Sequence, residues 1–418
     1  MNNAAIIVKI NSIRPHPNAD NLVIVDLFGT QVITSKDIQQ GELMAYYDSN
    51  LRLSPEYLRS NNLYRHSELN SDPTKTGYFD DNGRVKAIKL RGEFSDGVLL
   101  SLYSFKDFEP NKGKREAYFV QGLEFTEYNG TSICEKYVPL IPKGTKIPGE
   151  KNSKTSISSV MFKEHYDTGQ FFKEQYKIAP GLIYIIEKTH GTSGRIGHVI
   201  VDTEKEISKW KANLIRFITR LFTRGSATFY SYRYIHGSRR VVYMDRTIEG
   251  FHDNTMREEI FNSVKGMLQK GKELYFEIYG YEKSGREIQK GFPYGCKPGE
   301  YKAKLYRVTM NNEDGELVDY SLGYVINKAK ELGMEYPHIF ETYYYDGTEE
   351  SMKILEQKVI QHAQGQSVLD PNTLKEGVIV QFLNQRGLWD CLKYKSDAFR
   401  LKESGDRDKG IIDQEDIN

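Results

Sequence analysis

The chain has 418 residues, of which 39% are hydrophobic and 28% charged, so it is long enough to form more than one hydrophobic core. Its 58 basic and 57 acidic residues nearly cancel, so any polyanionic partner must meet a local patch. No apolar stretch approaches the roughly 20 residues of a membrane span, and three widely spaced cysteines exclude a disulfide scaffold and a zinc ribbon.

The first hundred residues predict short strands separated by turns. We expect strands at 6–13, 22–27, 32–34, 42–47, 85–91 and 98–102. The last two are expected to form a closing hairpin around 92–97, after a polar loop at 54–84. Short strands at this spacing are typical of a small β-barrel.

A segment rich in proline and glycine, residues 104–150, follows as a linker with one or two strands. We place the domain boundary near 150, which gives domains at 1–150 and 151–418. Beyond it we expect helices at 156–176, 205–222, 325–334 and 347–364, and strands at 182–188, through most of 223–325, at 377–382 and at 389–395. Helix 205–222 has the clearest apolar periodicity, and the charged tail after Arg400 is expected to fray.

The N-terminal segment carries VKINSIRPHPNAD at 8–20, VIVDLFG at 23–29, GELMAYY at 41–47 and VKAIKLRGEFSDGVLL at 85–100. Together these strings resemble the OB-fold module of tRNA-binding proteins and synthetase appendages. The most specific part is His16 to Asp20, where a proline on each side of the histidine fixes a rigid turn. The alternative is that this motif is a purely structural turn.

One candidate site lies directly after the apolar strand at 182–186, in the run Glu187 to Ser193. A lysine at the mouth of a buried strand, followed by small residues, is positioned to meet a ligand phosphate with the backbone close by. Lys188 is therefore a candidate nucleophile. The alternative is a solvated lysine at the end of a strand.

Three later motifs support the candidate site. Glu277 lies in the apolar strand Tyr-Phe-Glu-Ile-Tyr-Gly, and Glu376 begins the strand Glu-Gly-Val-Ile-Val. Lys393 and Lys395 are two residues apart, so they point to one face of a strand. Two neighbouring buried cations are costly unless anions meet them, and ATP phosphates are such anions.

In this order the motifs resemble those of the covalent nucleotidyltransferases, the superfamily of polynucleotide ligases and capping enzymes. His190 stands where DNA ligases and capping enzymes carry Asp. A histidine at this position resembles the RNA ligase branch of the superfamily. The OB-like module in front resembles the arrangement of ATP-dependent RNA ligases that seal nicks bearing an RNA 3′-OH. The implied fold is α+β, with an N-terminal OB-type β-barrel followed by an antiparallel-sheet, ATP-grasp-like nucleotidyltransferase domain with helical insertions.

The resemblance implies ATP and Mg²⁺ or Mn²⁺ as cofactors. By this resemblance, Lys188 attacks the α-phosphorus of ATP, pyrophosphate leaves, and lysyl-AMP forms. The AMP then passes to a 5′-phosphate, and a 3′-OH finally displaces the AMP. Lys393, Lys395 and the metal ion disfavour the ammonium form of Lys188 and neutralise the charge that develops on the phosphates.

The remaining nucleotide contacts are also implied by the resemblance. Glu187 contacts the adenine amino group, Glu277 the ribose hydroxyls, and Glu376 the water shell of the metal ion. The other expected nucleotide-binding residues are Thr189, His190, Gly191, Arg239 and Tyr306, the last stacking on adenine. Glu277 has the alternative of an ion pair with an arginine, and Tyr306 that of a core residue. Ser193 departs from the asparagine of several RNA ligases.

Basic residues outside these motifs are candidates for RNA contact. Arg216, Arg220 and Arg224 are four residues apart and line one face if the helix persists, and Tyr230, Tyr232 and Tyr234 follow. The other candidates are Arg240, Lys89 and Arg91. The alternative for the helix is a solvated basic face.

We therefore expect an ATP-dependent RNA ligase that binds RNA ends or a nicked duplex with an RNA 3′-OH strand. The alternatives are another polynucleotide ligase or capping enzyme, and a noncatalytic tRNA-binding or RNA-binding protein. The cysteine usage, and the lack of a basic start followed by an apolar core, favour a cytoplasmic protein with no signal peptide and no membrane partner.

Overall fold

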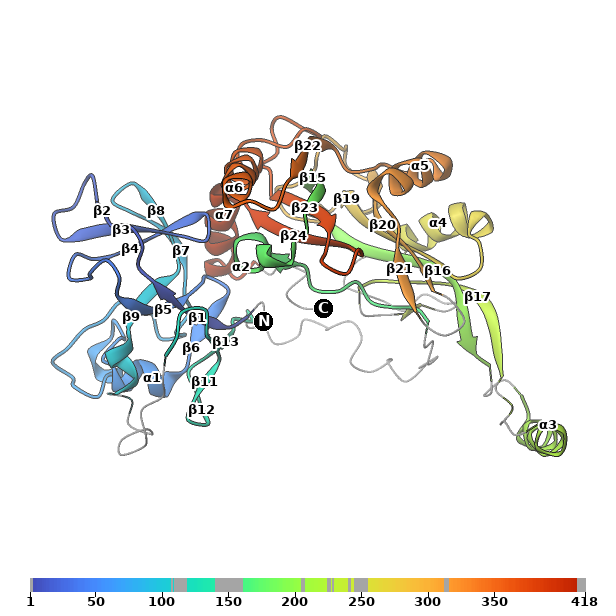
Figure 1. Cartoon of the computed structure of the whole chain (residues 1–418), viewed down its shortest axis with the longest axis horizontal. Coiled ribbons are helices and arrows are strands. Elements are labelled where there is room, and N and C mark those ends of the chain that lie inside the picture. The colour runs from blue at the N-terminus through green and yellow to red at the C-terminus, as the bar shows by residue number, and fades with distance from the viewer. Residues whose placement is uncertain are drawn as a thin grey trace.

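The computed structural model describes residues 3–106, 108, 119–139, 161–203, 207–223, 227, 229–239, 242–243, 255–311 and 316–411. The N-terminal strands lie on one side of helix α7 (Asp397–Asp408) and two larger sheets lie on the other (Figure 1). Within these residues no helix is long and apolar enough to cross a membrane.

The N-terminal part consists of short antiparallel strands in separate sheets. One sheet orders β10 (Glu124–Phe125), β1 (Ala5–Lys9), β5 (Leu43–Tyr47) and β9 (Val98–Ser101), and another orders β2 (Arg14–Pro15), β3 (Leu22–Leu27) and β4 (Thr30–Ser35). Three two-stranded sheets complete the N-terminal part: β7 (Ala87–Leu90) with β8 (Glu93–Asp96), β6 (Leu51–Leu53) with β13 (Cys134–Lys136), and β11 (Glu127–Tyr128) with β12 (Thr131–Ser132). The predicted short strands are present, but the described strand pairs do not close into a barrel.

The predicted closing hairpin is wrong. β7 turns back at Arg91 and Gly92, both with positive φ, and pairs with β8. β9 pairs instead with β5, with Met44 opposite Ser101. The polar loop at 54–84 also contains helix α1 (Pro55–Ser60), which begins where the Ser54 hydroxyl accepts the Tyr57 N–H.

The C-terminal part contains two sheets. The first orders β14 (Gly169–Gln170), β24 (Trp389–Lys395), β23 (Gly377–Leu383), β15 (Gly181–Lys188) and β22 (Ile339–Tyr345). The second orders β18 (Val242–Tyr243), β17 (Tyr230–Gly237), β16 (Thr192–Asp202), β19 (Lys272–Gly280), β20 (Tyr301–Asn311) and β21 (Leu317–Asp319). All neighbours are antiparallel except β14 and β24. The α+β class with antiparallel sheets is confirmed.

Each sheet has its own hydrophobic core. Helix α6 (Glu349–Ala363) buries Leu355, Val359 and Ala363 against the first sheet. Helices α4 (Thr255–Val264) and α5 (Leu322–Leu332) cover the second. The β-rich interpretation of 223–325 missed α4, whose buried residues include Met256, Ile260 and Val264.

Three other expectations differ from the structure. The helix predicted at 156–176 is wrong in its described part, where a loop leads to β14 and the short helix α2 (Phe171–Glu174). Helix α3 (Lys209–Phe222) is confirmed as a helix, but Ala212 is its one buried residue. The tail does not fray at Arg400, because α7 continues to Asp408. The predicted boundary near residue 150 lies outside the described residues.

Helix α7 is held by side chains from the N-terminal part of the chain. The Arg84 guanidinium lies 2.9 Å from the Asp408 carboxylate and donates to the Ser404 carbonyl at 3.0 Å. Arg400 forms a second ion pair, with Asp96. These contacts stabilise a segment that is too charged to predict a buried helix from its sequence.

Candidate active site

A cleft with an empty volume of about 1100 Å³, part of it open to solvent, lies between the two C-terminal sheets. Strand β15 belongs to the first sheet and β16 to the second, so the chain crosses between them at 189–191. The sequence-predicted residues that line the cleft are Glu187, Lys188, Thr189, Ser193, Arg239, Glu277, Tyr306 and Lys393. The motifs predicted to act together therefore share one cavity.

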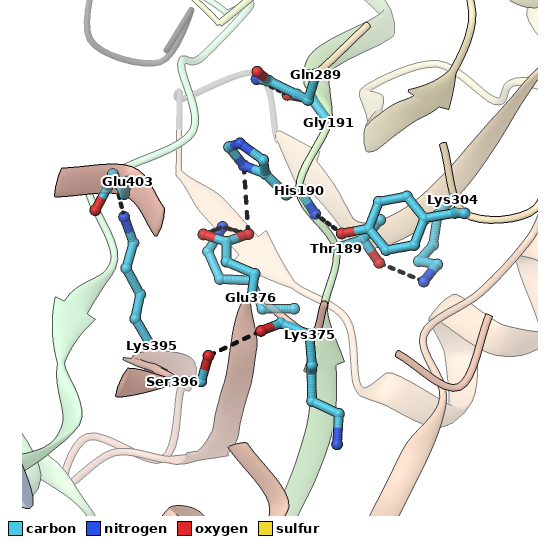
Figure 2. A network of polar contacts seen from close by, with 12 residues as sticks. Thr189, His190, Gly191, Gln289, Lys304, Lys375, Glu376, Lys395, Ser396 and Glu403 are labelled. Atoms are coloured by element: carbon cyan, nitrogen blue, oxygen red, sulfur yellow. Dashed lines mark hydrogen bonds and ion pairs between the residues drawn. The ribbon is translucent and has the colours of Figure 1, made fainter. Parts of the chain in front are cut away.

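Lys188 at the end of β15 forms an ion pair with Glu376, which directly precedes β23. The Lys188 Nζ lies 2.8 Å from both carboxylate oxygens, and the Glu376 side chain is 1% exposed. The Nδ1 of His190 lies 3.7 Å from the Glu376 Oε2 (Figure 2). The amine is thus held beside a buried carboxylate that is within reach of its proton.

The crossing after Lys188 is fixed by its neighbours. The His190 N–H donates to the Tyr294 hydroxyl at 2.8 Å, and Gln289 donates to the Gly191 carbonyl at 2.8 Å. A Cβ at Gly191 would lie 2.3 Å from the Ile278 carbonyl oxygen, so only glycine fits against β19. Neither His190 nor Gly191 is among the residues that line the cleft.

Lys304 on β20 is a cleft residue that sequence analysis missed. Its ammonium donates to the Thr189 hydroxyl at 2.5 Å, and it lies opposite Glu277 in the β19–β20 register. Lys304 is 2% exposed, and this burial lowers its pKa to about 8 despite nearby Glu187, Glu335 and Glu277. A lysine between apolar residues in an otherwise ordinary strand was the available signal.

Glu187 and Glu277 lie on opposite walls. The Val368 N–H donates to Glu187 Oε1 at 3.3 Å, and this carboxylate faces the cleft from β15. Glu277 faces it from β19, with Ser193 as its partner across the β16–β19 ladder. The cleft is therefore lined by a carboxylate from each sheet.

The two lysines of β24 have different surroundings. Lys393 lines the cleft, but the Lys395 Nζ lies 2.9 Å from the Glu403 Oε1 on α7. Burial opposes the charged form of Lys395, but Glu403 and Glu376 outweigh it and raise its pKa. Burial likewise acts to raise the pKa of Glu403, but Lys395 and Arg407 lower it to about 2. The Glu403 carboxylate, which the sequence analysis did not predict, thus pairs with Lys395, one of the two β24 lysines.

The outer part of the cleft is aromatic and charged. The Tyr306 ring lies 5.3 Å from the His165 ring, edge to face, and Arg239 forms an ion pair with Asp167. Arg307 and Asp319, also in the cleft lining, form a salt bridge of 2.5 Å. Sequence analysis did not single out the His165 to Asp167 segment or the Arg307–Asp319 pair, because neither lies in a recognisable motif.

No family model matches the sequence, and no curated protein has significant similarity to it. Solved structures of an RNA ligase from Naegleria gruberi match nearly the whole chain. The structure with pyrophosphate has a TM-score of 0.59 and 16% identity, over 96% of this chain and 98% of that chain. A mutant with ATP and Mn has a TM-score of 0.57 and 14% identity, over 97% and 99%. A mutant with AMP and Mn has a TM-score of 0.57 and 14% identity, over 95% and 98%.

The chain has the fold of this RNA ligase. Identity this low establishes the fold and not the activity, which depends on the site. In this RNA ligase fold, the cleft lies at the crossing between the two C-terminal sheets.

Glu376 is a candidate ligand for a metal ion beside Lys188. Among the described residues, no group of three or more His, Cys, Asp or Glu side chains gathers as a metal site. Mg²⁺ prefers to keep several waters and to bind one or two carboxylates together with substrate phosphates. Glu376, a buried carboxylate beside Lys188, fits this kind of site.

The predicted RNA-binding residues do not gather at the cleft. Arg216 and Arg220 lie on α3, which follows β16 and lies apart from the cleft at the far end of the β16–β17 ribbon (Figure 1). Lys89 and Arg91 are exposed at the β7–β8 hairpin. Arg224 and Arg240 lie outside the described residues.

The His16 motif has structural contacts. The buried His16 ring places Nε2 3.1 Å from the Leu90 carbonyl oxygen, and its Nδ1 accepts the Asn18 N–H at 3.0 Å. Asn18 donates to the Arg91 carbonyl at 2.9 Å. These bonds tie the turn to the β7–β8 hairpin, which supports its interpretation as a structural turn.

Proposed function

We propose that the protein is an ATP-dependent RNA ligase that joins an RNA 3′-OH to a 5′-phosphate through a lysyl-AMP intermediate. The observation that carries this proposal is the Lys188 amine in a cleft that is also lined by Lys304, Lys393, Glu187 and Glu277. The shared fold supports it, because the Naegleria gruberi ligase structures hold ATP, AMP and pyrophosphate. These are the substrate, the transferred group and the leaving group of self-adenylation.

In the first step, the Lys188 Nζ forms a bond to the α-phosphorus of ATP. The bond from that phosphorus to the oxygen bridging to the β-phosphorus breaks, and pyrophosphate leaves with the electron pair. Lys188 must first lose a proton, and the Glu376 carboxylate at 2.8 Å is positioned to accept it. Glu376 would also hold Mg²⁺ or Mn²⁺ through water, and the ion supplies neutralisation of phosphate charge.

The other cleft residues bind and orient the nucleotide in this proposal. Lys304 and Lys393 meet its phosphates from opposite sheets, because both are cations that line the cavity. Glu187 accepts a hydrogen bond from the adenine amino group, and Glu277 accepts hydrogen bonds from the ribose hydroxyls. Tyr306 stacks on adenine, since its ring faces the same cavity.

The later steps transfer AMP to RNA. The 5′-phosphate oxygen attacks the phosphorus of lysyl-AMP, so that Lys188 leaves and a 5′-adenylylated end forms. The 3′-OH oxygen then attacks the 5′-phosphorus, and AMP leaves with the electron pair. We assign nick binding to an OB-type N-terminal module, on which Lys89 and Arg91 are exposed cations.

The test is self-adenylation. The purified chain with Mg²⁺ and α-labelled ATP should yield an acid-labile covalent adduct, and Lys188→Ala should abolish it. Lys302→Ala, at a partly exposed lysine on β20, is the matched control and should keep the adduct. An adduct that persists in Lys188→Ala contradicts the mechanism, and one formed from GTP but not ATP favours a capping enzyme.

The substrate assignment needs a separate comparison. Nicked duplexes should differ only in the sugar at the 3′-OH end. We expect ribose ends to be sealed and deoxyribose ends to react slowly, and equal sealing of all-DNA nicks contradicts the RNA assignment. A covalent adduct without sealing of any nick would support self-adenylation but contradict the proposal that nicked duplexes are the substrate.

A further inference from the structure

Helix α3 presents an apolar surface to solvent. Trp210 is 65% exposed and Phe222 is 83% exposed. The other large exposed apolar residues of this helix are Leu214, Ile215, Phe217, Ile218 and Leu221. With 3.6 residues per turn, Trp210, Leu214, Phe217 and Leu221 lie along one side. A soluble helix normally packs such a stripe on a core, but none of the described residues covers this one.

The opposite side of α3 contacts the rest of the protein. Ala212 is buried, and Arg216 and Thr219 are half-buried. The Arg216 guanidinium lies 5.8 Å from the Phe229 ring centre, at the start of β17. These contacts orient the helix so that its apolar stripe faces away from the molecule.

The charge of α3 has one sign. Lys209, Lys211, Arg216 and Arg220 lie within the helix, and residues 207–223 contain no aspartate or glutamate. Lys209, Lys211 and Arg220 are exposed. A partner that complements this surface must therefore be both apolar and anionic.

These properties discriminate between possible partners. RNA would pair with the cations but leave Leu, Ile and Phe side chains in water. A second copy would cover the apolar stripe but bring two sets of cations together. An anionic bilayer surface accommodates both, because its acyl boundary takes up apolar side chains and its head groups attract lysine and arginine.

We propose that α3 is an interfacial helix that binds anionic lipid membranes and lies in the plane of the surface. Its 14 residues give a length of about 21 Å, which is too short to cross a bilayer. The helix lies apart from the cleft at the end of the β16–β17 ribbon (Figure 1), so membrane binding leaves the cleft open. This proposal replaces the sequence-based expectation of no membrane partner, and it does not depend on the proposed ligase activity.

The test uses the full chain and lipid vesicles. We expect it to float with vesicles that contain phosphatidylglycerol and to remain unbound with phosphatidylcholine alone. Leu214→Glu should lower the bound fraction about tenfold, because it places a charge on the apolar stripe. Leu388→Glu, at the turn between β23 and β24, is the matched control, since Leu214 and Leu388 are both 48% exposed.

A second measurement follows Trp210 directly. In a Trp389→Phe background, Trp210 is the one remaining tryptophan. Phosphatidylglycerol vesicles should shift its fluorescence emission to shorter wavelength, and Lys209→Glu with Arg220→Glu should remove that shift.

Three results would overturn the proposal. The first is the absence of binding to phosphatidylglycerol vesicles by the folded wild-type chain. The second is a wild-type dimer in sedimentation that Leu214→Glu converts to monomer, with no vesicle binding, which indicates a second copy as the occupant. The third is RNA binding that Leu214→Glu abolishes, which indicates a nucleic-acid surface. Thermal melting shows whether each variant is folded.

Discussion

The cleft and helix α3 both gather basic side chains, but their surroundings differ. In the cleft region, Lys188 pairs with Glu376 and Lys395 pairs with Glu403, and these contacts are largely buried. On α3 the cations are mostly exposed, and no acidic residue lies within the helix. A buried cation is costly unless a carboxylate or another polar partner meets it, whereas an exposed one is solvated by water. The same residue types therefore support two different proposals, nucleotide chemistry in the cleft and membrane attachment on α3.

The largest expected effect tests the carboxylate beside Lys188, the proposed nucleophile. Glu376→Gln removes the proton acceptor and the negative charge next to Lys188, so adduct formation should slow at least about 100-fold. The rate is measured with α-labelled ATP. Glu349→Gln, at an exposed carboxylate of α6, is the control and should retain the rate. A Glu376→Gln rate within a few-fold of wild type would mean that Glu376 neither accepts the proton nor holds the metal.

A second effect concerns stability. Glu403→Ala leaves Lys395 and Arg407 without their shared carboxylate, and should lower the free energy of unfolding by about 3 kcal/mol. Urea denaturation measures this change. Glu349→Ala, at an exposed residue of α6, should change it by less than about 0.5 kcal/mol. Equal midpoints for the two variants would show that the buried pair contributes nothing to the fold.

The same residue gives a dependence on pH. The pKa of Glu403 falls from its ordinary value of 4.5 to about 2 in the folded protein. Its contribution to stability is therefore present above pH 4.5 and is lost as the pH falls toward 2. The stability of Glu403→Gln should decline less steeply than that of wild type over this range.

A third, smaller effect concerns nucleotide affinity. Lys304 has a pKa of about 8, so its positive charge is lost as the pH rises through that value. Affinity for an α,β-methylene analogue of ATP should fall about tenfold between pH 7 and pH 9, because the neutral amine attracts phosphate weakly. Calorimetric titration measures it. The affinity of Lys304→Met for the analogue should depend little on pH, whereas that of Lys302→Met should fall with pH as in wild type. Identical curves of affinity against pH for the two variants would exclude Lys304 as a phosphate ligand.

The smallest expected effect is on α3. Leu214→Glu should change the free energy of unfolding by less than about 0.5 kcal/mol, because the side chain already faces water. Leu355→Ala, in the core under α6, should cost about 3 kcal/mol. A large loss of free energy of unfolding in Leu214→Glu would show that the apolar stripe packs on the protein itself. The contrast between an exposed α3 and the buried contacts of the cleft would then fail.

Sequence periodicity and motif order predicted much of the active half. The strands around Lys188, Glu277, Glu376 and Lys393 lie where runs of apolar residues indicated, and these side chains gather in one cleft or at its edge. Periodicity failed for the tail after Arg400, because the ion pairs that stabilise α7 come from residues about 300 positions earlier in the chain.

The sequence by itself determined the nucleophile candidate and the apolar periodicity of the helix predicted at 205–222, because these depend on local spacing, and its motif order implied the α+β class through a family resemblance. The tertiary structure decided that Glu403 faces Lys395, that Lys304 enters the cleft, and that no other part of the described chain covers the apolar side of α3. Contacts between distant segments leave no periodic signal along the chain, and the same apolar stripe predicts a helix whether a core, a partner or a membrane covers it.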